Sequence, residues 1–156
     1  PVVSCFDFGH SVADIAALLD PLSKHFIHFN NIEIEGDALA LQIVLRNLVD
    51  NAIRHSDRRE LMIAIDVVEN EPGVLTFTVG DNGNGLLGPD IRRINGNETA
   101  SPAGDSYGFR GVRRLVRSRG GDVWTGAPLF ASGATVHFTL PGRILGERTA
   151  SASRAA

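Results

Sequence analysis

Two asparagines and one arginine stand at a spacing that could bind a metal ion and an anion together. Asn47, Asn51 and Arg54 occupy positions i, i+4 and i+7, which lie on one stripe of a helix. An amide oxygen is a hard, neutral ligand suited to Mg²⁺, and a guanidinium pairs well with phosphate. Asparagine is a mediocre helix former, so Glu, Lys or Gln would suit a purely solvated face better. The stripe alone therefore does not decide between a site for a metal and an anion and an ordinary solvated helix face.

A carboxylate followed by glycines supplies a second motif. Asp81 comes directly after the apolar, β-branched run 74–79, and Gly83 and Gly85 follow it. Glycine permits positive φ and lets a ligand approach the backbone closely. An Asp-Asn-Gly sequence by itself is more often a tight hairpin turn. The combination of the asparagine helix, the strand and this turn favours a ligand site.

A third group of residues combines glycines with a basic helix. Gly104, Gly108 and Gly111 lead into residues 108–119, where apolar residues recur at helical spacing and arginines lie between them. The free N–H groups and the dipole at such a helix start favour an anion. The arginines are predicted to form a solvated face that also attracts phosphate.

His10 has no acidic residue directly after it and is not interpreted as a phosphoryl acceptor.

Hydrophobic periodicity predicts the elements that must position these residues. The central helix is predicted over residues 37–56, with Asp37 as its N-cap. Residues 86–107 are rich in Gly, Asn, Pro and Ser, and the part over 95–107 is predicted to form a mobile lid. Further helices are expected over 11–25, 89–94 and 108–119, and strands over 26–29, 32–35, 61–69, 74–80, 123–125 and 134–140.

Size and composition set wider limits. The 156 residues are long enough for one domain with its own core, and the net charge of −3 gives no argument for nucleic acid or a membrane surface. Cys5 is the single cysteine, which excludes an internal disulfide and fits a reducing, cytoplasmic location. No apolar run of about 18 residues occurs that could span a bilayer. We expect the chain to be a fragment of a longer protein.

The order of these motifs resembles the ATP-binding catalytic domain of sensor histidine kinases, in the superfamily that also contains DNA gyrase and MutL. Residues 47–56 resemble the N box of that family, and 81–85 and 104–112 resemble its two glycine boxes. The resemblance runs from about Phe6 to Pro141. It implies an α+β, two-layer sandwich, the Bergerat ATP-binding fold, with a mixed five-stranded sheet covered on one face by about three helices. The domain is expected over residues 1–141, followed by a disordered tail over 142–156.

The resemblance also implies a role for each motif residue. Asn51 would bind Mg²⁺ through its side-chain oxygen, and Asp81 would accept a hydrogen bond from the adenine amino group. ATP and Mg²⁺ are the implied cofactors. The implied partners are the kinase's own dimerisation and phosphoacceptor domain and a downstream response regulator, with no nucleic acid and no membrane contact by this fragment. The implied ATP-binding residues are Asn47, Asn51, Arg54, His55, Asp81, Gly83, Gly85, Gly108 and Gly111.

Two departures from the family patterns bear on activity. Members of the superfamily that hydrolyse ATP carry a Glu four residues before the metal-binding asparagine, where this chain has Asn47. An amide cannot act as a general base, which favours phosphoryl transfer to a histidine on a domain absent from this fragment. In the second glycine box Ser106 replaces the middle glycine, and no Phe box lies between residues 86 and 105, so the lid is short and atypical.

Two alternatives to a histidine kinase domain remain. One is an anti-sigma-type serine kinase, a stand-alone domain of similar length, which the wording of the N box disfavours. The other is a degenerate, non-catalytic module that docks a response regulator, supported by Ser106 and the missing Phe box. Retention of Asn51, Asp81 and Gly83 argues against that second alternative.

Overall fold

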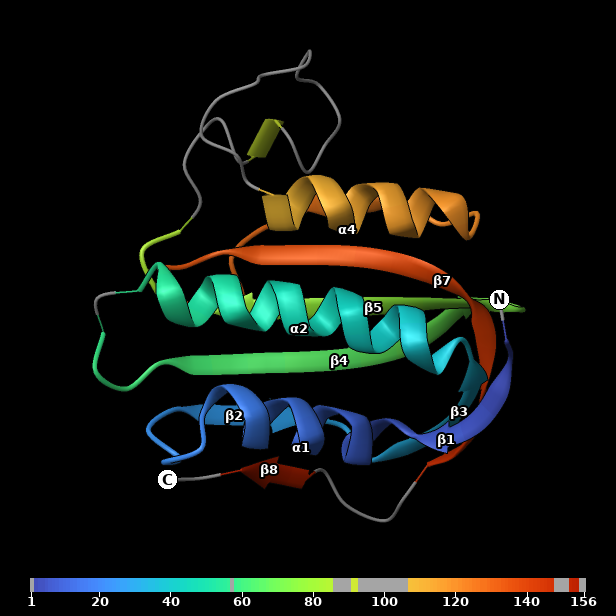
Figure 1. Ribbon diagram of the computed structural model, residues 1–156, viewed down its shortest axis with the longest axis horizontal. Helices are drawn as coiled ribbons and strands as arrows, with labels where there is room; N and C mark the ends of the chain where they lie inside the picture. The colour runs from blue at the N-terminus through green and yellow to red at the C-terminus, as the bar shows by residue number, and fades with distance from the viewer. Residues whose placement is uncertain (1, 57, 86–90, 93–106, 148–151, 155–156) are drawn as a thin grey trace.

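Three long helices lie on one face of a single β-sheet. The computed structural model describes residues 2–56, 58–85, 91–92, 107–147 and 152–154. Helices α1 (Phe8–Leu19), α2 (Ala38–Arg54) and α4 (Tyr107–Ser118) pack side by side over the sheet (Figure 1). The helix expected over 89–94 and the lid expected over 95–107 fall outside the described residues, apart from 91, 92 and the start of α4.

The part of the chain that the structure describes forms eight strands in this sheet, where five were expected. Their order is β1-β3-β7-β5-β4-β2-β8, and β6 pairs with β7 beside this path. Only β2 and β4 pair in parallel among the described strands, so the sheet is mixed, as predicted. The strands are β1 (Ser4–Asp7), β2 (Phe26–Phe29), β3 (Ile32–Gly36), β4 (Met62–Glu71), β5 (Val74–Asp81), β6 (Val123–Thr125), β7 (Thr135–Glu147) and β8 (Ala152–Arg154).

Side-chain caps fix where the first two helices begin. Asp7 accepts a 3.1 Å hydrogen bond from the backbone N–H of His10, so α1 starts three residues before the predicted position. It ends at Leu19, because Pro21 cannot continue the helix. Asp37 caps α2 in the same way, as predicted, with a 3.0 Å bond from the N–H of Ala40. Within the described part of the chain, no helix has the length and apolar character that a transmembrane span needs.

The core lies between the helices and the sheet. Alternate residues of the central strands point toward the helices, and Phe77 stacks on Phe138 at 4.9 Å between ring centroids. Leu45 of α2 is fully buried over them, as is Val44. The apolar stripe predicted for the central helix is therefore the face that packs on the sheet. The opposite face of the sheet carries a different pair, Trp124 stacked on His137.

Residues 142–147 and 152–154 lie in strands, where a disordered tail was expected. Strand β7 continues past residue 141 to Glu147, and β8 pairs with β2 at the edge of the sheet. Beyond Pro141, β7 leaves its pairing with β5 and pairs with β3 instead. Glu69 supports this extension, since its side chain accepts a 2.8 Å bond from the N–H of Ile144. The domain boundary expected after residue 141 therefore falls inside a paired strand.

Candidate functional site

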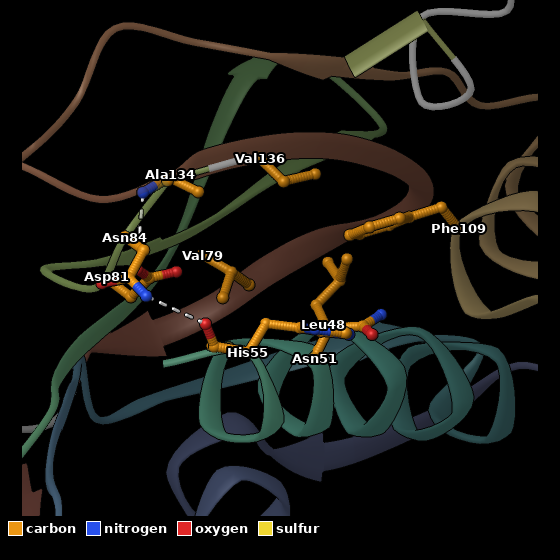
Figure 2. Close-up of a pocket in the computed structure, with 11 residues that line it drawn as sticks. Leu48, Asn51, His55, Val79, Asp81, Asn84, Phe109, Ala134 and Val136 are labelled. Carbon is orange, nitrogen blue, oxygen red and sulfur yellow. Dashed lines mark hydrogen bonds between the residues drawn. The ribbon is translucent and has the colours of Figure 1, made fainter. Parts of the chain in front are cut away.

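A cavity of about 230 Å³ lies between the last turns of α2 and the start of α4 (Figure 2). The end of β5 and the beginning of β7 also line it. One wall is apolar and consists of Leu48, Val79, Phe109 and Val136, each no more than 5% exposed. The other wall carries polar groups from α2 and from the loop after β5. Ligand pockets typically combine an apolar wall with a few fixed polar groups, so this is the candidate site.

Asp81, the last residue of β5, is the buried polar group of this cavity. Its Oδ1 accepts hydrogen bonds from the backbone N–H of Gly83 at 2.8 Å and of Ala134 at 3.4 Å. Burial raises the pKa of Asp81, and these two hydrogen bonds oppose the rise. Both bonds use Oδ1, and no described residue donates to Oδ2. A carboxylate oxygen is thus available to a ligand inside an apolar cavity.

The glycines of the loop after β5 determine its conformation. Gly85 has φ +85°, a conformation that side chains rarely adopt, and it lines the cavity. A Cβ at Gly83 would lie 3.0 Å from Oδ1 of Asp81, which is tight against the carboxylate. Asn82 fixes the strand end, because it exchanges two hydrogen bonds with the backbone of Met62. The sequence Asp-Asn-Gly-Asn-Gly therefore builds a site here and not a simple hairpin.

Helix α2 contributes Asn51 and His55 to the cavity. These residues stand at i and i+4, near the C-terminal end of the helix (Figure 2). The backbone oxygen of His55 accepts a 3.4 Å hydrogen bond from Asn84 Nδ2, which closes the wall between α2 and the β5 loop. The two elements that carry the main sequence motifs are thus brought together, as their resemblance to one family implies.

Other predicted residues do not line the cavity. Asn47 donates a 2.9 Å hydrogen bond to the backbone oxygen of Ile43, one turn back on its own helix. The side chain of Arg54 is 71% exposed and pairs with Asp50 at 3.4 Å. Gly83 lies behind Asp81, whereas Gly108 and Gly111 fall in the first turns of α4. Four predicted residues line the cavity directly: Asn51, His55, Asp81 and Gly85.

Several residues that build the site were not predicted from the sequence. Ala134 bonds to Asp81 across 53 positions of the chain, and no local pattern marks such a contact. Gly133 has φ +105°, and a Cβ there would lie 1.8 Å from the backbone oxygen of Asp81. The only local sign of this close packing is that Gly133 comes just before the β-branched residues that begin β7. Phe109 lies in the second glycine box, so its apolar side chain at that place could have been noticed.

The donor set can be compared with the metal that the family implies. Among the described residues, no group of three His, Cys, Asp or Glu side chains gathers to hold a metal ion. Asn51 offers one neutral amide oxygen to the cavity. Mg²⁺ usually keeps several waters and takes few protein ligands when it is bound with phosphates. One amide oxygen at this cavity therefore fits Mg²⁺ that arrives with phosphates.

Two histidine kinases resemble this chain over most of its length. The sensor histidine kinase WalK of Bacillus subtilis is 30% identical over 118 residues, which cover 70% of this chain and 19% of WalK. The hybrid signal transduction histidine kinase C of Dictyostelium discoideum is 24% identical over 159 residues, 87% of this chain and 13% of that kinase. The chain thus spans less than a fifth of the length of these relatives.

Solved structures share the fold. The catalytic domain of histidine kinase ThkA superimposes with a TM-score of 0.69 at 19% identity, covering 90% of this chain and 97% of that one. Full-length ShkA, solved in complex with AMPPNP, gives 0.71 at 23% identity, covering 92% of this chain and 32% of ShkA. These similarities confirm the predicted two-layer α+β fold.

A family model matches residues 36–144, which include α2, the β5 loop, α4 and most of β7. The matched span is well over half of the chain, and it contains each residue that lines the cavity. The chain therefore belongs to the histidine kinase-, DNA gyrase B-, and HSP90-like ATPase family.

Proposed function

We propose that this chain is the Mg·ATP-binding catalytic domain of a sensor histidine kinase. It would supply the γ-phosphate of ATP to a histidine on a dimerisation domain outside these 156 residues. The observation that carries the proposal is the buried carboxylate of Asp81, which faces an apolar cavity with one oxygen unoccupied by described donors. The two relatives named above are both histidine kinases, which supports the same function.

The cavity has the features that adenine recognition requires. Oδ2 of Asp81 would accept a hydrogen bond from the amino group of adenine, and guanine presents a carbonyl at that position. Leu48, Val79 and Phe109 would cover the faces of the base. The complex of ShkA with AMPPNP supports an adenine nucleotide as the ligand of this fold. A carboxylate left unpaired beside guanine makes binding unfavourable, so the site would select ATP.

The phosphates would extend from the base toward the start of α4. Asn51 would bind Mg²⁺ through its amide oxygen, and Asn47 would lie one turn away from the metal. Arg54 and His55 would face the phosphates after rearrangement of their exposed side chains. Gly108, in the first turn of α4, would offer its backbone N–H group to a phosphate. Gly111 would leave room for the nucleotide, because no atom lies within 4 Å of its Cβ position, and Gly83 and Gly85 would let the nucleotide approach the backbone. Bound Mg²⁺ would neutralise phosphate charge during transfer.

The residues of this chain would position the nucleotide, not activate the acceptor. Asn47 stands where a general base would be needed for hydrolysis, and an amide cannot remove a proton from water. Phosphoryl transfer depends mostly on positioning and charge neutralisation, which a domain without a nucleophile can supply. The acceptor histidine and its base would come from the dimerisation domain, and the phosphoryl group would then pass to a response regulator.

Calorimetric titration with ATP tests this proposal. We expect the chain to bind ATP, to bind it more tightly with Mg²⁺, and to bind GTP at least about tenfold more weakly because its base leaves Asp81 unpaired. Equal affinity for ATP and GTP would contradict the role of Asp81. Absence of ATP binding at millimolar nucleotide would overturn the proposal in favour of a docking module that has lost its ligand.

A further inference from the structure

Helices α2 and α4 run antiparallel and are joined at one end by an ion pair. Arg119, directly after α4, places its Nε 3.0 Å from Oδ2 of Asp37, directly before α2. The two side chains are only 29% and 10% exposed. The helices lie side by side, with the start of α2 beside the end of α4 (Figure 1). This ion pair therefore connects two elements 82 positions apart in the sequence.

Asp37 uses both of its carboxylate oxygens. Oδ1 accepts the capping hydrogen bond from the N–H of Ala40, and Oδ2 accepts from Arg119. Burial favours the neutral acid, but the two hydrogen bonds and the nearby positive charge of Arg119 together hold the pKa of Asp37 below its usual value. The charged carboxylate is thus the stable form, and it fixes the start of α2 against the end of α4.

The end of α4 is fixed by its backbone as well. Gly120 has φ +83° and donates to the oxygen of Arg117 at 3.1 Å, and Gly121 donates to Val116 at 2.9 Å. These two bonds form a Schellman motif, which closes the helix. Gly121 also lies against β7, where a Cβ would be 1.9 Å from the oxygen of Thr139. This end of the helix pair has little freedom to move.

The opposite end of the same helix pair forms the cavity. Leu48 and Asn51 of α2 face Phe109 of α4 across it (Figure 2). Phe109 and Arg119 are ten residues apart, or about 15 Å along a helix. A tilt of about 5° at Arg119 would therefore shift Phe109 by about 1 Å, by the geometry of a rigid helix. Displacements of that size are enough to alter how a bound substrate is positioned.

We infer that Asp37 and Arg119 are positioning residues that set the width of the nucleotide cavity from the far end of the helix pair. The inference rests on the proposed function, because it assigns the pair a role in nucleotide binding. Neither residue lines the cavity or would touch ATP. Their contribution acts through α4, whose start carries Phe109.

Four variants of the 156-residue chain separate this role from a general loss of stability. Arg119→Gln removes the cation. Asp37→Ser removes the charge and keeps an N-cap acceptor. The double variant tests whether the two residues act as a pair. Arg117→Gln is the matched control, because Arg117 lies two residues earlier and pairs with Asp122 at 3.4 Å on the surface, with side chains 54% and 62% exposed.

Two measurements are made on each variant. Hydrogen exchange of the nucleotide-free chain follows the amides of residues 111–114, near the cavity end of α4, and those of 116–121 beside the ion pair. Calorimetry follows the affinity for Mg·ATP. We expect Arg119→Gln and Asp37→Ser each to raise exchange at 111–114 and to weaken ATP binding by about fivefold, with the double variant no worse than either one. Arg117→Gln should change neither quantity by more than about twofold.

The outcomes distinguish the inference from the proposed function. Faster exchange confined to 116–121 and the start of α2, with ATP affinity equal to that of the control, would overturn the positioning role and leave a local anchor. Additive losses in the double variant would overturn the pairing. If the parent chain does not bind ATP, the proposed function fails, and hydrogen exchange alone tests the coupling between the two ends of the helix pair. The coupling is then overturned if Arg119→Gln and Asp37→Ser exchange at 111–114 at the same rate as the Arg117→Gln control.

Discussion

The backbone N–H of Gly83 donates a 2.8 Å hydrogen bond to Oδ1 of Asp81, two residues earlier in the chain. This bond folds the loop back onto the carboxylate and fixes the direction of the side chain. Ala134, directly before β7, donates to the same oxygen at 3.4 Å. The carboxylate is thus oriented before a ligand arrives, which lowers the cost of binding one.

Replacement of Asp81 by asparagine should weaken ATP binding by at least about tenfold, since one hydrogen-bond acceptor is lost in a buried site. The variant can still accept from Gly83 through its amide oxygen, so the fold should persist. Calorimetry gives the affinity, and a thermal melt checks the fold. Asp66→Asn is the matched control: burial also raises the pKa of Asp66, but this residue does not line the cavity. Unchanged ATP affinity in Asp81→Asn would exclude Asp81 from base recognition.

The raised pKa of Asp81 has a consequence for stability. Because the folded protein binds the proton more tightly than the unfolded chain, ionisation of Asp81 costs folding free energy. This cost is absent below the usual carboxyl pKa and grows as the pH rises through the raised folded value. The free energy of unfolding of Asp81→Asn relative to the parent should therefore increase with pH from about 4 upward. A difference that is constant with pH would show that the pKa is not raised.

Asn51 and Asn47 should differ in their effect on Mg²⁺. Asn51 lines the cavity, whereas Asn47 donates to Ile43 on its own helix. Asn51→Ala should abolish most of the tightening of ATP binding by Mg²⁺, because the amide oxygen is lost. Asn47→Ala should retain more of that tightening. Titrations of both variants with and without Mg²⁺ give the comparison, and a full Mg²⁺ effect in Asn51→Ala would move the metal elsewhere.

Glu69 should make stability depend on acid. Its carboxylate accepts bonds from the N–H of Ile144 at 2.8 Å and of Gly73 at 3.0 Å, which lower its pKa. The stabilisation is complete above the usual carboxyl pKa and is lost as the pH falls through the lowered folded value. Glu69→Gln should therefore be less stable than the parent at pH 7, with a gap that narrows toward pH 3.

Urea unfolding between pH 3 and pH 7 measures this gap. Glu71→Gln, at the exposed end of the same strand, is the control for loss of one negative charge. The explanation fails if the two variants give the same gap at every pH.

Gly133→Ala should damage both the fold and the site. The residue has φ +105°, and a Cβ would meet the backbone oxygen of Asp81 at 1.8 Å. We expect a loss of about 2 kcal/mol or more in the free energy of unfolding, because the strained conformation and the contact both oppose a side chain. Gly146→Ala, near the far end of β7 and with no atom within 4 Å of its Cβ position, should be close to neutral. Equal stability of the two variants would show that the segment before β7 adapts.

Local patterns predicted the central helix and the central strands of this fold. Helix α2 was expected from its apolar stripe and its Asp37 cap, and both are present. Strands β4 and β5 were expected within two residues of their observed ends, because a run of β-branched residues between turns defines a strand locally. The presence of Asn51, His55 and Asp81 at one cavity followed from their resemblance to one family and not from the residues alone.

Nonlocal contacts account for what the sequence did not predict. Pro141 suggested the end of a strand, since proline cannot donate to a ladder. The strand continues because Gly142 donates to the oxygen of Gly73 at 3.0 Å and packs so closely on Glu35 that a Cβ would not fit. The ion pair between Asp37 and Arg119 was likewise invisible, because 82 positions separate them and neither flanking sequence indicates the other.

The place of β7 in the strand order has a consequence for how the protein is made. This strand stands between β3 and β5, so it joins the half of the sheet formed by β1 and β3 to the half formed by β5, β4 and β2. A ribosome delivers residues 135–147 after all of those strands. Until then the two halves have no shared ladder, and Asp81 lacks its partner Ala134. The nascent chain must therefore expose strand edges until residues 135–147 have been made, and chaperone binding or aggregation would compete with folding at that stage.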